Sequence, residues 1–221
     1  MESKVKVKLC GQTSLAGADL SLKMGADYIG VALEVESSPR SLSLEAARPI
    51  FEEHRAHAFL LTCHMPLEKL EEAVMELDPY AVQLTGNESP EDLAALKDAI
   101  GGLVYKSIHL APEGGGQRTL EEILAQMEAY AASGADGFVL DTASEGKFGG
   151  TGAKSDWALA AKIIAASSQP VFIAGGINPQ NITEAAAIPG VYGVDLASGV
   201  ESAPGVKDEA KLTALFSALR G

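Results

Sequence analysis

The feature that most constrains this chain is a regular alternation of short apolar runs with longer amphipathic stretches. Eight apolar runs are expected to form strands, at residues 5–10, 28–33, 58–63, 81–84, 104–109, 137–141, 171–174 and 193–196. Eight stretches with helical periodicity follow them, at residues 15–24, 44–54, 67–77, 90–100, 120–132, 156–166, 179–187 and 208–219. The predicted strands are apolar throughout, which is typical of parallel strands that are buried on both faces.

Eight strand–helix pairs in 221 residues predict an α/β fold, a single (β/α)₈ TIM barrel that occupies residues 1–221 as one domain. Ser89-Pro90-Glu91 and Asn178-Pro179 each predict a capping side chain before a proline in the first helical turn. Helix ends are predicted at Gly25, Gly101 and Gly134. A doubly wound sheet is the competing architecture, but its glycine-rich turn usually follows the first strand, whereas here such segments come late.

The charge balance limits the partners. The chain has 17 Lys and Arg against 30 Asp and Glu, a formal net charge of −13. Binding to nucleic acid or to an anionic membrane requires cations that neutralise phosphates, so neither partner is expected. An anionic small molecule would need a local site of cations or backbone amides.

The chain also carries few signals for export or metal binding. Residues 1–8 contain no apolar run like that of a signal peptide, and no later stretch approaches the roughly 20 apolar residues that span a bilayer. The two cysteines, Cys10 and Cys63, are too few for a disulfide framework. There is no CxxC or HExxH motif, so we expect a cytoplasmic protein without a bound metal.

Two late glycine-bearing loops predict a phosphate site. Ala174-Gly175-Gly176-Ile177-Asn178-Pro179 follows the seventh predicted strand, and Ser198-Gly199 follows the eighth. Glycines allow the backbone to approach a ligand, and a helix expected directly after the first loop would add free amides. Barrels often bind phosphate after these two strands, so two such loops favour phosphate over two unrelated tight turns.

Two ionisable residues end predicted strands. Cys10 ends the first, where it is either a small buried hydrophobe or a base or nucleophile of the site. Asp141 ends the sixth, across the barrel mouth, and a carboxylate there is costly to bury without a function or a partner.

Arg40, in Ser38-Pro39-Arg40, is either a solvated loop residue or a carboxylate ligand. His64 and His109 lie near strand ends, and the glycine-rich residues 149–152 are interpreted as an active-site loop.

Together these segments resemble the phosphoribosylanthranilate isomerase family. The matching segments run in family order over nearly the whole chain: Lys8-Leu9-Cys10-Gly11-Gln12-Thr13, Gly25-Ala26-Asp27, Ser38-Pro39-Arg40, Val82-Gln83-Leu84-Thr85-Gly86-Asn87-Glu88, Leu140-Asp141, Gly149-Gly150-Thr151-Gly152, Asp156-Trp157, Ala174-Gly175-Gly176-Ile177-Asn178-Pro179, Gly193-Val194-Asp195-Leu196-Ala197-Ser198-Gly199-Val200-Glu201 and Pro204-Gly205-Val206-Lys207-Asp208.

The resemblance implies an Amadori rearrangement in tryptophan biosynthesis, without a cofactor. N-(5-phosphoribosyl)anthranilate would become 1-(2-carboxyphenylamino)-1-deoxyribulose 5-phosphate. By position in the family pattern, Cys10 is the general base, Asp141 the general acid and Arg40 the ligand of the anthranilate carboxylate. The implied phosphate ligands are Gly175, Gly176, Ser198 and Gly199.

Several positions depart from the family pattern, among them Thr85 where the family has histidine, two acids in the strand-two loop, Glu34 and Glu36, and Ala197 in place of a common serine. The changes at residues 34, 36 and 85 lie toward the anthranilate end of the implied site. They leave open a paralogous barrel isomerase or epimerase acting on another phosphorylated sugar or aminosugar. A non-catalytic phosphometabolite-binding protein is a third reading. The pattern is compatible with a monomer or a homodimer.

Overall fold

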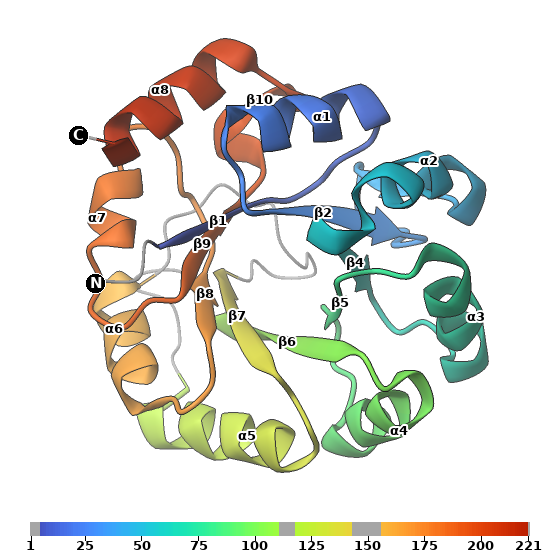
Figure 1. Ribbon diagram of the computed structural model, residues 1–221. Coiled ribbons are helices and arrows are strands. Elements are labelled where there is room, and N and C mark those ends of the chain that lie inside the picture. Colours follow the sequence, from blue (N-terminus) through green and yellow to red (C-terminus); the bar gives the residue numbers. More distant parts are fainter. Residues whose placement is uncertain (1–4, 111–117, 143–155, 221) are drawn as a thin grey trace.

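The computed structural model describes residues 5–110, 118–142 and 156–220. Within them, parallel strands pair in the order β1-β9-β8-β7-β6-β5-β4-β2, and the pairing of β1 with β2 closes the ring. The predicted (β/α)₈ barrel is therefore confirmed (Figure 1). The barrel strands are β1 (Lys6–Leu9), β2 (Tyr28–Leu33), β4 (Ala58–Thr62), β5 (Ala81–Leu84), β6 (Leu103–Leu110), β7 (Gly137–Thr142), β8 (Val171–Ile173) and β9 (Gly193–Leu196).

The helices form a ring around these strands (Figure 1). They are α1 (Leu15–Met24), α2 (Leu44–His54), α3 (Leu67–Leu77), α4 (Pro90–Ile100), α5 (Leu120–Ala132), α6 (Trp157–Ala166), α7 (Ile182–Ala186) and α8 (Glu209–Arg220). The predicted cap of α4 is confirmed, because the Ser89 side chain accepts from the Asp92 amide while the Asp92 side chain accepts from the Ser89 amide. Gly25 and Gly101 are the residues that end α1 and α4.

The expected helix at Asn178-Pro179 is wrong. Helix α7 begins at Ile182 and has 5 residues. The preceding segment is a turn held by its own asparagines, since Asn178 Oδ1 accepts from the Gln180 amide and Asn181 Oδ1 accepts from the Asn178 amide. Side-chain bonds of this kind compete with the first turn of a helix. The sequence predicts a helix directly after Gly175-Gly176, and the structure has none there.

Several short elements between the barrel strands and the helices were not predicted from the sequence. Strand β3 (Ser41–Leu42) pairs with β2 directly after Arg40. After β9 come the 3₁₀ turn η2 (Ser198–Val200) and a small hairpin of β10 (Glu201–Ala203) and β11 (Val206–Lys207). A second 3₁₀ turn, η1 (Arg55–His57), follows α2. Elements of two or three residues carry too little periodicity to be recognised.

The core has two layers. Apolar residues between strands and helices form the larger cluster, and a smaller cluster that includes Phe59, Tyr105 and Phe172 fills the barrel interior. Where the strands begin, the Tyr28 hydroxyl lies 3.2 Å from those of both Tyr80 and Tyr192. We call this aromatic group, Tyr28, Phe59, Tyr80, Tyr105, Phe172 and Tyr192, the barrel floor. It closes one end of the barrel.

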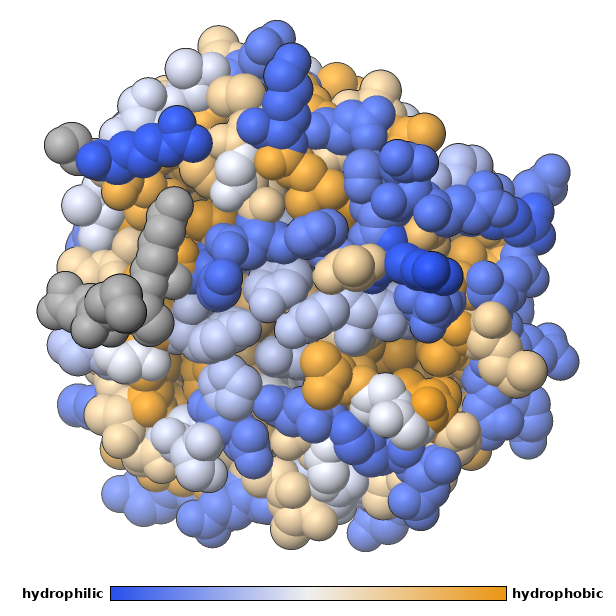
Figure 2. All heavy atoms as spheres, viewed as in Figure 1, coloured by the Kyte–Doolittle hydropathy of each residue, from blue (hydrophilic) through white to orange (hydrophobic). Residues whose placement is uncertain are grey.

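Hydrophilic side chains are spread over the face shown in Figure 2, with smaller groups of apolar residues between them. Among the described helices, none combines the length and the apolar character needed to cross a membrane. The polar surface and the apolar interior agree with the alternation seen in the sequence.

Candidate active site

A cavity of about 260 Å³ opens at the C-terminal ends of the barrel strands. Residues at or just after the ends of these strands line it, among them Cys10, Ala32, Leu61, Gln83, Ser107, Val139, Asp141, Ala174 and Asp195. Because the strands are parallel, all their carboxyl ends meet at this mouth. The loops that follow β1, β2, β8 and β9 complete the walls.

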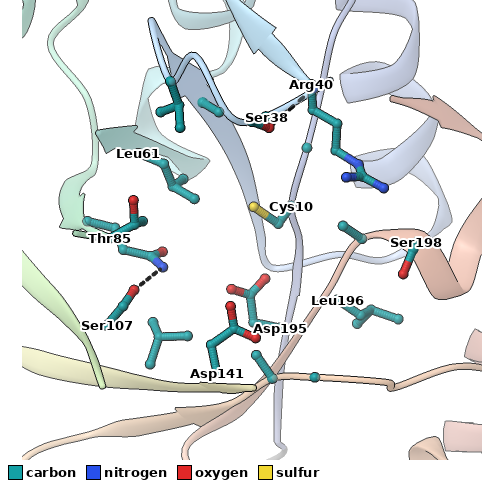
Figure 3. A pocket seen from close by; sticks show the side chains of 18 of the residues that line it. Cys10, Ser38, Arg40, Leu61, Thr85, Ser107, Asp141, Asp195, Leu196 and Ser198 are labelled. Atoms are coloured by element: carbon teal, nitrogen blue, oxygen red, sulfur yellow. Dashed lines mark hydrogen bonds between the residues drawn. The ribbon is translucent and has the colours of Figure 1, made fainter. Parts of the chain in front are cut away.

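Cys10 and Asp141 line the same pocket (Figure 3). Cys10 directly follows β1, where its amide donates to the Leu196 carbonyl at 2.9 Å. The thiol lies against Gly30 on β2, where an added Cβ would stand 2.8 Å from Sγ. Asp141 belongs to β7 and pairs in register with His109 of β6. The fold therefore places the two predicted ionisable groups around one cavity.

A buried lysine lies behind the thiol. The Lys8 side chain is 0% exposed, and its Nζ donates to Asp195 Oδ2 at 2.7 Å and to Gln83 Oε1 at 2.9 Å. The β1–β9 register places Lys8 opposite Asp195. Burial alone would lower the pKa of Lys8, but Asp195 and Cys10 raise it above its ordinary value, so the ammonium stays charged.

The surroundings of Cys10 have opposing effects on the pKa of its thiol. Burial raises the pKa of Cys10, while the positive charges of Lys8 and Lys207 act to lower it. Burial is the larger effect, and the pKa of Cys10 lies above its ordinary value. In this structure the cysteine is accordingly a thiol at neutral pH, with cations placed to stabilise the thiolate.

Asp195 is a second carboxylate in the pocket, close to Asp141 (Figure 3). Its Oδ2 accepts from Lys8, and its buried Oδ1 has no hydrogen-bond partner among the described residues. Sequence reasoning assigned no role to Lys8 or Asp195. The signal was present, since charged residues inside two apolar strands that are neighbours in a barrel must face inward and pair.

The two predicted phosphate loops touch each other. Gly175 and Gly176 have φ values of 88° and 66°, which favour glycine, and both line the pocket together with Ser198. A Cβ on Gly199 would lie 2.0 Å from the Ile177 carbonyl oxygen, so only glycine permits this contact. The amides of Gly175, Gly176, Ser198 and Gly199 donate to no acceptor among the described residues. Such amides favour an anion.

Arg40 also lines the pocket, but it is already engaged. Its Nε lies 3.0 Å from both carboxylate oxygens of Glu201, and its Nη2 donates to Glu201 Oε2 at 2.6 Å. Lys207 donates to Glu201 at 2.8 Å and to the Cys10 carbonyl at 2.5 Å. We call these three residues, Arg40, Glu201 and Lys207, the charge cluster. The sequence indicated only its arginine.

Among the histidines, His109 lines the pocket and His64 lies in a neighbouring hollow beside Glu34 and Lys69. His109 Nε2 lies 2.7 Å from the Thr85 carbonyl, so this nitrogen carries the hydrogen. Burial lowers the pKa of His109, which keeps the ring neutral at pH 7. A histidine ring is thus placed beside the threonine that departs from the family pattern.

The loop at 149–152 lies outside the described residues. Within the part of the chain that is described, no group of three or more His, Cys, Asp or Glu side chains is arranged to hold a metal ion. The polar groups around the cavity are instead suited to proton transfer and to binding anions.

The fold and the site together define a (β/α)₈-barrel protein with a thiol and two carboxyls at its mouth and two adjoining loops suited to phosphate. The family described as N-(5′-phosphoribosyl)anthranilate (PRA) isomerase matches residues 7–218, and the chain belongs to this family.

The sequences of relatives align with this chain over nearly their full length. The N-(5′-phosphoribosyl)anthranilate isomerase of Methanopyrus kandleri is 36% identical, covering 92% of this chain and 93% of its own. That of Beijerinckia indica is 34% identical, covering 98% and 94%. The crystal structure of the Thermus thermophilus phosphoribosyl anthranilate isomerase superposes with a TM-score of 0.80 at 33% identity, covering 98% of both chains.

Proposed function

We propose that this chain isomerises N-(5′-phosphoribosyl)anthranilate by general acid–base catalysis. The observation that carries the proposal is the placement of Cys10 and Asp141 around one cavity that two glycine-bearing loops adjoin. A related isomerase, with a TM-score of 0.79 and 28% identity over 98% of this chain and 99% of its own, was crystallised with reduced 1-(o-carboxyphenylamino)-1-deoxyribulose 5-phosphate. That ligand carries the phosphate and the carboxylate for which the pocket offers partners.

The first chemical step needs an acid. Asp141, in its protonated form, donates a proton to the ribose ring oxygen, and the C1–O bond breaks as the nitrogen lone pair forms an iminium. Asp195, which pairs with Lys8, lines the same pocket beside this acid. Ring opening leaves a hydroxyl where the ring oxygen was.

The second step needs a base. The Cys10 thiolate removes the proton on C2, and the electron pair moves to form the enamine while the iminium nitrogen is neutralised. The resulting enol tautomerises to the ketone product. Lys8 and Lys207 stabilise the thiolate on which this step depends. The overall reaction moves hydrogen within one molecule and consumes no co-reactant.

Separate groups of residues bind the two charged ends of the substrate. The amides of Gly175, Gly176, Ser198 and Gly199 hold the phosphate, and the Arg40 guanidinium meets the anthranilate carboxylate. An overall charge of −13 repels a substrate that carries both a phosphate and a carboxylate, so these local donors must overcome it. The substrate is held at both ends, with C1 and C2 between the acid and the base.

The test is turnover by the purified protein, followed as the loss of anthranilate fluorescence from phosphoribosylanthranilate. We expect saturable turnover, and we expect the gene to restore growth without tryptophan to a bacterium that lacks this isomerase. Absence of both, in protein that binds the reduced product, would support a non-catalytic binder. Turnover of a different phosphorylated sugar alone would indicate a paralogous isomerase or epimerase.

A further inference from the structure

The charge cluster has a geometry that a loop arginine does not acquire by itself. Arg40 lies on the loop after β2, whose neighbouring Ser37 and Pro39 are exposed. Its own side chain is only 12% exposed, and that of Glu201 is 3% exposed. The bidentate contact between them joins this loop to β10, which follows β9, the strand on the other side of β1.

Two further contacts fix the arginine. A Cβ on Gly11, whose φ is 73°, would stand 2.3 Å from Arg40 Cδ, so the stem of the side chain lies directly on the turn after Cys10. The Lys207 side chain is 0% exposed. Its Nζ donates to Glu201 Oε1 and to the Cys10 carbonyl oxygen. The Arg40 side chain, the backbone of the turn after β1 and the segment after β9 therefore share one set of contacts.

The contacts leave one edge of the guanidinium for a ligand. Nε and Nη2 point at Glu201, while Nη1 donates to no described residue. Figure 3 shows the side chain reaching from the loop at Ser38 toward the side of the pocket where Ser198 lies. With one carboxylate against two cations, the cluster keeps a positive charge for an anion. Burial would raise the pKa of Glu201, but Arg40 and Lys207 lower it, so its charge is retained at neutral pH.

We propose that Glu201 is a positioning residue for substrate recognition: it holds Arg40 in the one orientation that presents Nη1 to the carboxylate of the aromatic amine, and Lys207 holds Glu201 in turn. This inference rests on the proposed function and deepens it. Glu201 itself touches no substrate. We call the contact between Glu201 and Arg40 the clamp. Because the clamp restricts the Arg40 side chain before the ligand arrives, it lowers the entropy cost of binding.

Simple electrostatics and the proposed positioning role predict opposite effects of removing the Glu201 charge on the binding of an anion. Removing the negative charge of Glu201 would by itself strengthen the attraction of the cluster for an anion. Loss of the clamp instead releases Arg40 and weakens carboxylate binding. Glu201→Gln removes charge and clamp, whereas Glu201→Asp keeps the charge and shortens the reach. A loss in both variants is therefore a loss of positioning.

Calorimetry with two ligands tests this, using the reduced product and its counterpart with a phenylamino group that lacks the carboxyl. We expect Glu201→Gln and Glu201→Asp to weaken the reduced product about tenfold or more and the carboxyl-free ligand less than about twofold. Added to Arg40→Ala, Glu201→Gln should change either affinity less than about twofold, because its effect acts through Arg40. Glu76→Gln, in the exposed Arg48–Glu76 pair, is the matched control and should change neither.

Unchanged or tighter binding of the reduced product by Glu201→Gln would overturn the proposal, as would equal losses for both ligands or additive losses with Arg40→Ala. Wild-type turnover of phosphoribosylanthranilate is measured beforehand. Its absence would reject the proposed function, whereas turnover with equal ligand losses would reject the clamp alone. Protein that binds neither ligand would reject both.

Discussion

At the scale of single residues, the site sets burial against charge around Cys10. Because parallel strands deliver their ends to one mouth, position at a strand end marked Cys10 and Asp141 as candidates, and the family resemblance suggested their roles. The same reasoning missed Lys8, Asp195 and Glu201. Their importance comes from pairing across strands and loops far apart in the chain, which one sequence does not display.

The pH profile of the reaction follows from the thiol. Only the thiolate acts as a base, and the pKa of Cys10 lies above its ordinary value, mainly because of burial and despite Lys8 and Lys207. The thiolate fraction therefore grows as pH rises. We expect kcat/KM for the wild type to increase through neutral into alkaline pH, and this limb to vanish in Cys10→Ala. Cys63→Ser, which alters the other cysteine outside the pocket, should keep the limb. A flat wild-type profile over this range would contradict the assignment of the base.

At the scale of elements, the loops after β8 and β9 act together. The sequence indicated both loops, but placed a helix directly after the first one. The structure instead has a turn over residues 178–181, in which Asn178 Oδ1 accepts from the Gln180 amide and Asn181 Oδ1 accepts from the Asn178 amide. The contact between the loops, with Gly199 against Ile177, depends on distance in space and was not readable from either motif alone.

Gly199→Ala tests the paired loops. Its Cβ would stand 2.0 Å from the Ile177 carbonyl oxygen and 3.0 Å from Asn178 Cα, so the loops must separate. We expect kcat/KM to fall about 10- to 100-fold, mostly through KM, and competitive inhibition by inorganic phosphate to weaken in parallel. Gly102→Ala is the control, since the nearest atom to its added Cβ lies at 3.7 Å. Phosphate inhibition equal to that of the wild type would place the phosphate elsewhere.

At the scale of the whole molecule, the barrel separates stability from chemistry. Its fold class and most element bounds could be predicted, because burial on both faces of parallel strands leaves a strong pattern in the sequence. The aromatic floor could not, since Tyr28, Tyr80 and Tyr192 belong to three distant segments that meet only when the ring closes. The floor packs the end of the barrel opposite the cavity.

Gly193→Ala tests this separation. The added Cβ would lie 2.4 Å from Phe172 Cε1 and 2.9 Å from the Lys6 carbonyl oxygen, which overpacks the barrel interior near the floor. We expect the free energy of unfolding in urea to fall by about 1–3 kcal/mol. We expect kcat/KM at 25 °C to stay within about twofold of the wild type, because the mouth is untouched. A large loss of turnover with unchanged stability would show that floor and mouth are not independent.

The proposed reaction depends on Cys10 and Asp141 performing proton transfers on a substrate held between them. The sharpest test is kcat for phosphoribosylanthranilate in the wild type, Cys10→Ala and Asp141→Asn, together with the affinity of each protein for the reduced product. We expect each substitution to lower kcat by about 100- to 10,000-fold, while the circular dichroism spectrum and the affinity for the reduced product stay close to those of the wild type. Near-wild-type turnover in either folded variant would contradict the proposed reaction.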